Sequence, residues 1–191
     1  MNKSRVILGS AIFKLKYFKD KLISDYQKSL FGQNKNSRIH PSFRLGFDNF
    51  VQIDPEFEID IAENVAINKN NFLIFRKKGS LSIGKNTYIT NSTISCRGKI
   101  KIGKNCLIGE GAKMFDHNHS YTRNPFSVLA DEFNIGEIII GDNLWTGSNV
   151  TILKNVKIGD NVIIGSGCLI HKDIPANSIV KNRTEVIIDK F

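Results

Sequence analysis

The fold is decided by residues 140–175, which read IGDNLWTGSNVTILKNVKIGDNVIIGSGCLIHKDIP and repeat every six residues. The first position of the hexads is aliphatic except at Thr146, and the fifth is aliphatic except at Cys168. The first column is Ile140, Thr146, Ile152, Ile158, Ile164 and Ile170, and the second is Leu144, Val150, Val156, Val162, Cys168 and Ile174. A period of six matches neither a continuous helix, which repeats every 3.6 residues, nor a single strand, which alternates every two.

A short strand followed by a turn explains this period, because the Asn and Gly between the aliphatic residues tolerate the positive φ angles of turns. Three such units close a triangular coil, and stacked coils pair their strands in parallel about 4.8 Å apart. The aliphatic columns then form one continuous core. We therefore predict an all-β fold, a parallel β-helix in the form of a triangular prism solenoid, over residues 39–175. A C-terminal tail follows at 176–191.

The hexads also occur upstream, with slips between blocks and one long interruption. Their aliphatic positions are Ile39, Leu45, Val51 and Phe57, then Ile61, Ile67 and Leu73, then Ile83 and Ile89, and finally Ile102, Ile108 and Met114. The interruption at about 115–137 lacks hexads, and we predict a long loop there. Insertions in a solenoid become excursions on one face and often carry the functional residues.

Residues 1–38 form a separate basic segment, for which we predict an amphipathic helix that ends at Gly32. Its apolar residues, spaced three or four apart, are Leu8, Ile12, Leu15, Phe18, Leu22, Tyr26 and Leu30. Residues 1–40 carry nine Lys and Arg against two Asp, so this segment holds most of the net charge of +9. Two interpretations are open. The helix docks on the prism, where it covers the open end of the solenoid or braces a neighbouring copy, or it contacts an anionic membrane surface.

Composition excludes several classes of protein. The nearly neutral body argues against nucleic-acid binding, which needs a basic working face. The three cysteines have no metal or redox spacing, which indicates a reducing compartment.

No apolar run approaches the ~20 residues of a membrane helix. The run VILGSAIF is too short, and lacks a clean cleavage site, for a signal peptide. We expect a cytoplasmic protein, whose basic helix is the part suited to the inner face of the membrane.

The repeat [LIV]-G-x-x-x-x, and especially the stretch from IG-x-N-x-W to KDIP, resembles the hexapeptide-repeat acyltransferases. Within them the chain is similar to the maltose, galactoside and nodulation-type O-acetyltransferases and to the capsule and lipopolysaccharide O-acetyltransferases. The resemblance implies a left-handed β-helix and a homotrimer with active sites between neighbouring prisms. It also implies acetyl-CoA as co-substrate and a carbohydrate acceptor.

The interruption follows Met114 and begins with FDHNHSY, residues 115–121, which contains two of the four histidines. Acyl transfer to a hydroxyl needs a base, and imidazole, with a pKa near ~6.5, can supply one. Counted without gaps from Ile102, the catalytic histidine of the resembled family falls on His119. His117 is then a shaping or substrate residue, beside Asp116. Two alternatives stay open: His117 is the base, or both are ordinary surface histidines. We expect no metal, because neighbouring residues in a loop cannot easily supply a full tetrahedral set.

The resemblance also assigns the acceptor site. Trp145, the only tryptophan, occupies a position where an indole lines the acceptor and thioester region, although core packing is an alternative. Thr90 stands where the galactoside and maltose enzymes use an Asn to hold the acceptor, and Asn91 is next to it. The acceptor therefore need not be the same sugar.

Four residues match positions that contact coenzyme A in the family. Ser148 and Ser166 match sites whose backbone amides hold the pantetheine arm. His171 and Lys172 match the region near the phosphates, where a cation suits the phosphate charge, although Lys172 is alternatively a solvated lysine. The family's G-x-P-A segment is replaced by IVKNRTEV, which leaves the adenine contacts open.

The resemblance leads us to expect an acetyl-CoA-dependent O-acetyltransferase acting on a carbohydrate, either a surface polysaccharide or its precursor. Histidine is the general base and the transfer is direct, although Cys96 is conceivable as a nucleophile in a two-step reaction. Two further alternatives are an N-acetyltransferase of an amino sugar and a non-catalytic hexapeptide-repeat protein.

Overall fold

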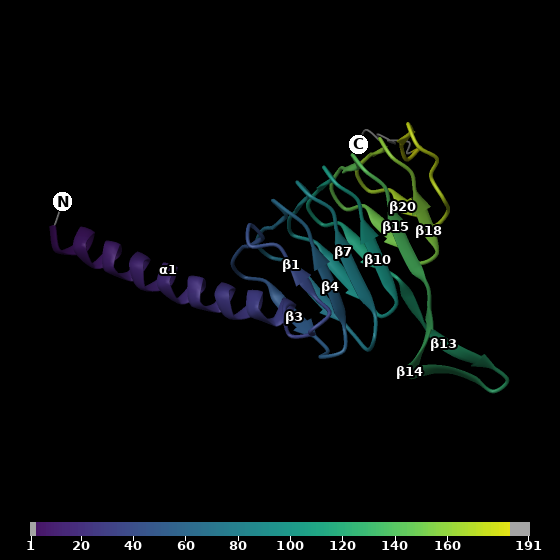
Figure 1. Cartoon of the computed structure of the whole chain (residues 1–191), viewed down its shortest axis with the longest axis horizontal. Coiled ribbons are helices and arrows are strands. Elements are labelled where there is room, and N and C mark those ends of the chain that lie inside the picture. Colours follow the sequence, from purple (N-terminus) through teal and green to yellow (C-terminus); the bar gives the residue numbers. More distant parts are fainter. Residues whose placement is uncertain (1–2, 184–191) are drawn as a thin grey trace, which may run out of the picture.

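A computed structural model describes the backbone of residues 3–183 and the side chains of residues 13–183. It confirms the predicted fold, a left-handed parallel β-helix of about six coils, from which one helix and one hairpin project (Figure 1). Each coil contributes one strand to each of three sheets, so strands of successive coils lie side by side. The coil continues past the predicted end at residue 175, because β21 (Ile179–Val180) pairs with the preceding coil.

The three sheets form the sides of the prism and follow one another along each coil. Sheet A contains β1 (Arg38–Ile39), β4 (Glu58–Ile61), β7 (Ser80–Ile83), β10 (Lys99–Ile102), β15 (Glu137–Ile140) and β18 (Val156–Ile158). Sheet B contains β2 (Arg44–Leu45), β5 (Ala66–Ile67), β8 (Tyr88–Ile89), β11 (Leu107–Ile108), β16 (Trp145–Thr146), β19 (Ile163–Ile164) and β21. Sheet C contains β3 (Phe50–Ile53), β6 (Phe72–Phe75), β9 (Thr93–Cys96), β12 (Lys113–Phe115), β17 (Thr151–Leu153) and β20 (Leu169–Ile170).

Both aliphatic columns of the hexads point into the prism, as the repeat predicts. Every residue of the two columns between Ile140 and Ile174 is at most 9% exposed. Most of the upstream hexad positions are buried as well, and only Ile39 and Val51, in the first coil, are partly buried. Burial of apolar side chains contributes about 25 cal/mol per Å², so these columns are the main source of stability.

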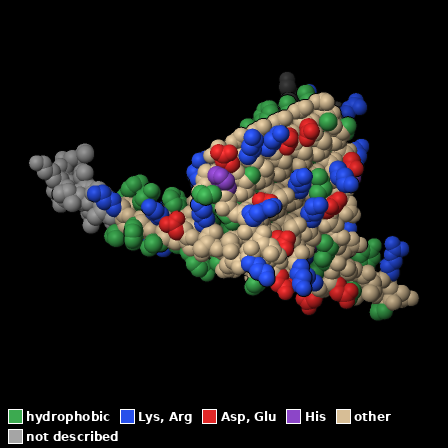
Figure 2. Space-filling model, in the orientation of Figure 1, with side chains coloured by type: hydrophobic (Ala, Val, Ile, Leu, Met, Phe, Trp, Pro, Cys, Tyr) green, Lys and Arg blue, Asp and Glu red, His purple; other side chains and the backbone are tan. Residues whose placement is uncertain are grey.

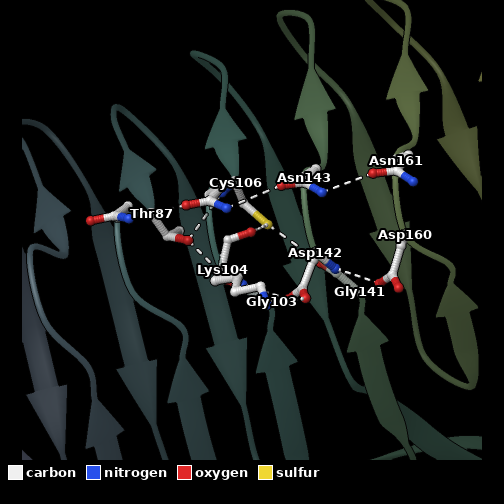
Figure 3. A network of polar contacts seen from close by, with 11 residues as sticks. Thr87, Gly103, Lys104, Cys106, Gly141, Asp142, Asn143, Asp160 and Asn161 are labelled. Carbon is white, nitrogen blue, oxygen red and sulfur yellow. Dashed lines mark hydrogen bonds and ion pairs between the residues drawn. The ribbon is translucent and has the colours of Figure 1, made fainter.

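An asparagine ladder lines the corner between sheets A and B (Figure 3). Its members are Asn64, Asn86, Asn105, Asn143, Asn161 and Asn177, all with φ between 55° and 58°. The side-chain amide of each donates to the side-chain oxygen of the next, for example Asn143 to Asn161 at 2.8 Å. Asn tolerates the left-handed conformation better than most residues, and here its side chain also links neighbouring coils.

Glycine is required at position 103, in one of the IG pairs, because successive coils approach closely at this corner. A Cβ atom on Gly103 would lie 2.2 Å from the carbonyl oxygen of Gly141 in the next coil.

The hexad pattern is interrupted between blocks because the coils differ in their number of residues. Glu58 pairs with Ser80, 22 residues on, whereas Ile138 pairs with Val156, 18 residues on.

Helix α1 (Lys3–Phe31) projects away from the prism (Figure 1), and its contacts with the prism extend from Tyr17, whose ring meets that of Phe47, to its C-terminal end. There Phe31 is 1% exposed and packs against Phe43 and Phe75 of the first coils. The hydroxyl of Ser24 donates to the carbonyl oxygen of Leu45 at 2.6 Å. The last turns of the helix therefore cover the open end of the solenoid. In the part of the chain that is described, no helix combines the length and apolarity needed to cross a membrane.

The interruption at 115–137 is not the long loop that the sequence predicts. It is an antiparallel hairpin of β13 (His117–Arg123) and β14 (Phe126–Ile135), with a register shift between His119 and Ser120. The hairpin leaves the prism at the corner between sheets C and A. Most of its side chains on both faces are exposed, so the sequence lacks the alternation of apolar and polar residues that identifies a half-buried strand.

The corner geometry predicts how Asn143 should respond to substitution. Asn143→Ala removes two links of the ladder and puts alanine at a φ of 58°, which costs about 1–2 kcal/mol for the backbone and roughly 1 kcal/mol for the hydrogen bonds. Asn143→Gly keeps the backbone conformation and loses only the links. Denaturant unfolding should therefore rank wild type above the glycine variant and the glycine variant above the alanine variant. An alanine variant as stable as wild type would contradict this account.

Candidate active site

Asp116 anchors the hairpin to the prism at the point where the chain leaves sheet C. Its side chain is 0% exposed. The carboxylate accepts hydrogen bonds from the amides of Arg97 at 2.9 Å and Gly98 at 2.8 Å and from the thiol of Cys96 at 3.0 Å. His117 Nδ1 lies 2.8 Å from the same carboxylate. A carboxylate only accepts, so Nδ1 of His117 carries the proton.

These contacts determine the protonation states of the Asp116 carboxyl group and the Cys96 thiol. Burial alone would raise the pKa of Asp116, but the hydrogen bonds from His117, Cys96 and the two amides outweigh it and lower that pKa below its usual value. Burial, followed by the charge of Asp116, strongly raises the pKa of the Cys96 thiol. Asp116 is therefore ionised and Cys96 is a neutral thiol.

The substrate contact predicted for Asp116 does not fit this burial. A side chain that is 0% exposed and holds four donors cannot reach a ligand unless the corner opens. Asp116 instead orients the His117 ring and connects the hairpin to the coil below.

The two predicted histidines both contact one aromatic ring, that of Phe133 of β14. The centroid of the Phe133 ring is 5.4 Å from that of His117, at an interplanar angle of 77°, and 4.5 Å from that of His119, at 40°. The His117 side chain is only 12% exposed, whereas His119 is an exposed residue. Nδ1 of His119 lies 3.3 Å from the carbonyl oxygen of Leu129, which favours the tautomer with the proton on Nδ1 and a free lone pair on Nε2.

Trp145 and Thr90 line one shallow hollow on the outside of sheet B. The hollow has a volume of about 320 Å³, and Tyr88, Leu107 and Glu110 also line it. Trp145 is 54% exposed, so its indole faces outward and does not pack in the core. Asn91 follows directly in the corner between sheets B and C, with a φ of 44°.

An apolar strip continues from this hollow along sheet B. It consists of Tyr88, Leu107, Trp145, Ile163 and Ile179, which lie in register on successive strands and are all exposed. Sheet A differs, since its outer face carries ion pairs such as Lys99–Glu137 at 3.8 Å and a dense mixture of charges (Figure 2). Exposed apolar strips of this kind mark surfaces that bind a partner or ligand.

Ser148 and Ser166 occupy equivalent places in successive coils, at the corner between sheets B and C. The amide of Ser148 donates to Oγ of Ser166 at 3.1 Å, so within the protomer that amide already has an acceptor. His171 and Lys172 are exposed and follow β20, at the corner between sheets C and A. That is the same corner from which the hairpin leaves, two coils earlier.

The predicted site residues therefore form two groups within one protomer. Trp145, Thr90, Asn91, Ser148 and Ser166 lie on sheet B or at its corner with sheet C. The other group, with His117, His119, His171 and Lys172, lies at the corner between sheets C and A. In a triangular prism that corner is opposite sheet B, so the histidines and Trp145 do not share a site in a single protomer.

Three contributors to the histidine site were missed from the sequence: the Phe133 ring, the Leu129 carbonyl and Arg97. The Cζ atom of Arg97 lies 3.5 Å from the centroid of the Phe133 ring. No spacing rule links Arg97 to a hairpin residue 36 positions away, so only the fold brings them together. Within the described part of the chain, no three His, Cys, Asp or Glu side chains are arranged to hold a metal ion.

Two curated relatives match part of the chain. YvoF of Bacillus subtilis is 34% identical over 82 residues, which cover 43% of this chain and 42% of that protein. The polysialic acid O-acetyltransferase of Neisseria meningitidis is 31% identical over 129 residues, which cover 58% of each. The chain thus spans about half the length of these relatives.

Solved structures share the architecture. AntD, an N-acyltransferase from Bacillus cereus whose mutant form was solved with dTDP and coenzyme A, superposes with a TM-score of 0.52 over 71% of this chain and 77% of that one. At 16% identity this likeness shows the fold alone.

Two family models match the repeats themselves. Residues 137–172 match the bacterial transferase hexapeptide of six repeats, and residues 99–113 match the hexapeptide repeat of succinyl-transferase. These matches confirm the resemblance seen in the sequence: the chain carries the hexapeptide repeats of the bacterial transferases.

Proposed function

We propose that the chain is an acetyl-CoA-dependent O-acetyltransferase that acts on a hydroxyl of a carbohydrate, either a surface polysaccharide or its precursor. The observation that carries this proposal is the exposed imidazole of His119, held through Nδ1 by the Leu129 carbonyl. The hexapeptide repeats of the bacterial transferases and the similarity to a polysialic acid O-acetyltransferase support it.

In this mechanism Nε2 of His119 takes the proton of the acceptor hydroxyl while the oxygen attacks the thioester carbonyl of acetyl-CoA. The resulting tetrahedral intermediate collapses, the carbon–sulfur bond breaks, and the imidazolium returns the proton to the leaving thiolate. A positioned base of this kind contributes about 10²–10⁴-fold to the rate. The Leu129 carbonyl supports the assignment because it stabilises the imidazolium that forms in the attack step.

His117 and Asp116 act as positioning residues in this proposal. The Asp116–His117 contact fixes one ring against Phe133, and the His119 ring packs against the same phenyl group. Disruption of Asp116 should therefore change the orientation of His119 without direct contact between the two.

Acetyl transfer is direct in this proposal. A two-step reaction through Cys96 would need its thiolate, but burial and the adjacent Asp116 raise the pKa of that thiol. Cys96 is also 0% exposed, so a thioester could not reach it without opening the corner.

A homotrimer completes the site. The hairpin at the corner between sheets C and A would extend over sheet B of the next copy, and the exposed hairpin residues Tyr121, Phe126 and Val128 match the apolar strip there. Trp145 and Thr90 of one copy would then face His119 of its neighbour. Acetyl-CoA would lie in this groove, with its pantetheine arm near Ser148 and Ser166 and its phosphates near His171 and Lys172.

Two alternatives are separable by experiment. An N-acetyltransferase of an amino sugar would give an amide product that resists hydroxylamine, whereas the O-acetyl ester is cleaved. A non-catalytic hexapeptide-repeat protein would give no turnover of acetyl-CoA with any member of a glycan panel.

We also propose that α1 contacts an anionic membrane surface. Leu15, Phe18, Leu22 and Tyr26 form one stripe on the helix and are 70%, 62%, 55% and 66% exposed. Ser24 and Phe31, on another side, contact the prism. Lys14, Lys19 and Lys21 flank the stripe, and hydrophobic and basic side chains lie along the described part of α1 (Figure 2). Such a helix suits an interface with anionic lipids, whose attraction is about 1 kcal/mol per lysine.

The base assignment predicts different effects of two histidine substitutions. His119→Ala should lower acetyl transfer by about 10²–10⁴-fold, because it removes the proposed general base. His117→Ala should have a smaller effect, because it removes only a positioning contact. The measurement is acetyl-CoA turnover, corrected for hydrolysis, with an acceptor identified from the glycan panel. Mild and equal effects would remove the assignment.

Asp116→Asn should destabilise the protein at neutral pH by roughly 1–3 kcal/mol, because the amide cannot accept all the donors that the carboxylate holds. The folded pKa of Asp116 lies below its ordinary value of 3.8, so its stabilisation is complete above that pH and is lost as the pH falls through the folded value. The stability difference from wild type should therefore narrow in acid.

The control for Asp116→Asn is Asp142→Asn, at the corner between sheets A and B. The pKa of Asp142 is also lowered, first by the hydrogen bond from the Lys104 amide, but its side chain is 34% exposed. We expect a smaller loss of unfolding free energy there. Equal losses at the two positions would argue against a special role for the buried carboxylate.

The membrane proposal predicts that the full chain binds phosphatidylglycerol vesicles and not phosphatidylcholine vesicles in a flotation assay. Phe18→Glu combined with Leu22→Glu should abolish binding, whereas Phe72→Ser, at an exposed aromatic on sheet C, should not. Binding that survives the double substitution would overturn the proposal. So would a change of oligomeric state in the double variant, because the stripe would then be an interface between copies.

A further inference from the structure

Arg97 presents a guanidinium group that has no polar partner among the described side chains. Its Cζ atom lies 3.5 Å from the Phe133 ring centroid, and its Nε atom is buried without a hydrogen-bond partner. No carboxylate within the described residues lies within ion-pair distance of it. An arginine with a buried, unsatisfied donor is unusual, because burying an unpaired polar group costs about 1–3 kcal/mol.

Two of the nearby acidic groups, Asp54 and Asp116, already have partners. Arg76 forms an ion pair with Asp54 at 3.1 Å, and the second oxygen of Asp54 accepts from the Lys77 amide at 2.8 Å. The Asp116 carboxylate holds four donors, of which only the backbone amide belongs to Arg97. The charge of the Arg97 side chain is therefore not neutralised by direct contact.

The surroundings of Arg97 also disfavour the charged form of its guanidinium group. Burial, followed by the like charge of Arg76, lowers the pKa of Arg97, and Asp54, Asp116 and Asp131 offset only part of this. An incoming anion would offset the burial and the repulsion from Arg76, because it would pair with the charge and satisfy the free donors.

The location of Arg97 connects this free cation to the chemistry. Arg97 follows β9 at the corner from which, one coil later, the hairpin leaves, and its guanidinium contacts the same Phe133 ring as His117 and His119. Stacking on a phenyl face leaves the edge of a guanidinium available for two parallel hydrogen bonds to a carboxylate or phosphate. The anion site thus lies beside the proposed base.

We propose that Arg97 is the anion receptor of the acceptor site and that the acceptor is an acidic carbohydrate, carrying a carboxylate or a phosphate. This inference rests on the proposed function. It assigns the anion to the acceptor and not to coenzyme A, because the phosphates of coenzyme A are separated from the thioester by the whole pantetheine arm. Paired with Arg97, the acidic group would hold the sugar so that a hydroxyl reaches His119.

The test compares acidic sugars with neutral counterparts. The probes are oligosaccharides of a hexuronic acid and of a nonulosonic acid, each with its carboxyl-reduced form, and a hexose phosphate with the free hexose. Affinity is measured by calorimetry or saturation-transfer NMR without acetyl-CoA, and KM and kcat are measured with it. We expect at least one acidic probe to bind tenfold or more tightly than its neutral partner, with an affinity that falls as salt increases.

Substitutions then assign the preference to one side chain. Arg97→Gln should remove the preference for the acidic probe, mainly through KM, and leave the affinity for the neutral partner unchanged. Lys99→Gln makes the same charge change two residues away, on the outer face of sheet A, and should keep the preference. Arg97→Lys should recover only part of it, because an ammonium cannot form the paired contact. A separate titration with coenzyme A should give the same affinity for wild type and Arg97→Gln.

The possible outcomes test the Arg97 inference and the proposed O-acetyltransferase activity separately. If no acidic probe binds more tightly than its neutral partner, or if Arg97→Gln weakens both equally, Arg97 is only a clamp for the hairpin and the inference is overturned. A loss of coenzyme A affinity in Arg97→Gln would also overturn it. If acidic probes bind through Arg97 but no acetyl is transferred to any of them, the anion site stands and the proposed O-acetyltransferase activity fails.

Discussion

The close stacking of one coil on the next is the constraint on which the rest of this structure depends. Parallel strands pair only if each coil makes its three turns at the same positions as the coil before it. Such turns require a glycine, or another residue in the left-handed backbone conformation, at the corners. Asn143 satisfies this requirement and also links its coil to its neighbours. At Gly103 the backbones approach so closely that even a methyl group would collide with Gly141. The aliphatic core follows from this geometry, because side chains at equivalent positions then stack in columns.

The same constraint explains how the coil accommodates the hairpin. Pairing of Lys99 with Glu137 continues sheet A across an insertion, so the coils above and below it are undisturbed. The Asp116 carboxylate makes this exit rigid, because it receives two backbone amides of the coil below and one imidazole of the hairpin. A buried charge is normally unfavourable, and here its hydrogen bonds compensate for the lost hydration. The hairpin can therefore hold His119 in one place although most of its surface is exposed.

The sequence predicted the coil well because its signal is local and periodic. The two columns from Ile140 to Ile174 are buried as the hexads require. The interruption was located correctly, but its hairpin was not predicted, since exposed strands lack a binary pattern. The outward orientation of Trp145 agrees with its place in the hexad. The burial of Asp116 and the contact of Arg97 with Phe133 could not be predicted, because they join residues of different coils through side-chain packing. Sequence periodicity predicts whether a side chain faces the core or the outside, but it does not predict which residues of other coils that side chain contacts.

The division of the predicted site residues between opposite sides of the prism has a direct physical consequence. A single prism has a rigid core, so no motion short of unfolding could bring Trp145 to His119. The proposed association between copies would avoid this, because a rotation would place the corner of one prism against the flat side of the next, and cyclic symmetry would repeat the contact without free edges. In the proposed trimer the exposed apolar strip on sheet B would face a neighbouring copy, and the charged outer face of sheet A would face solvent. If the anion receptor lies at the corner of one copy and Trp145 comes from another, acceptor recognition itself requires the assembled protein.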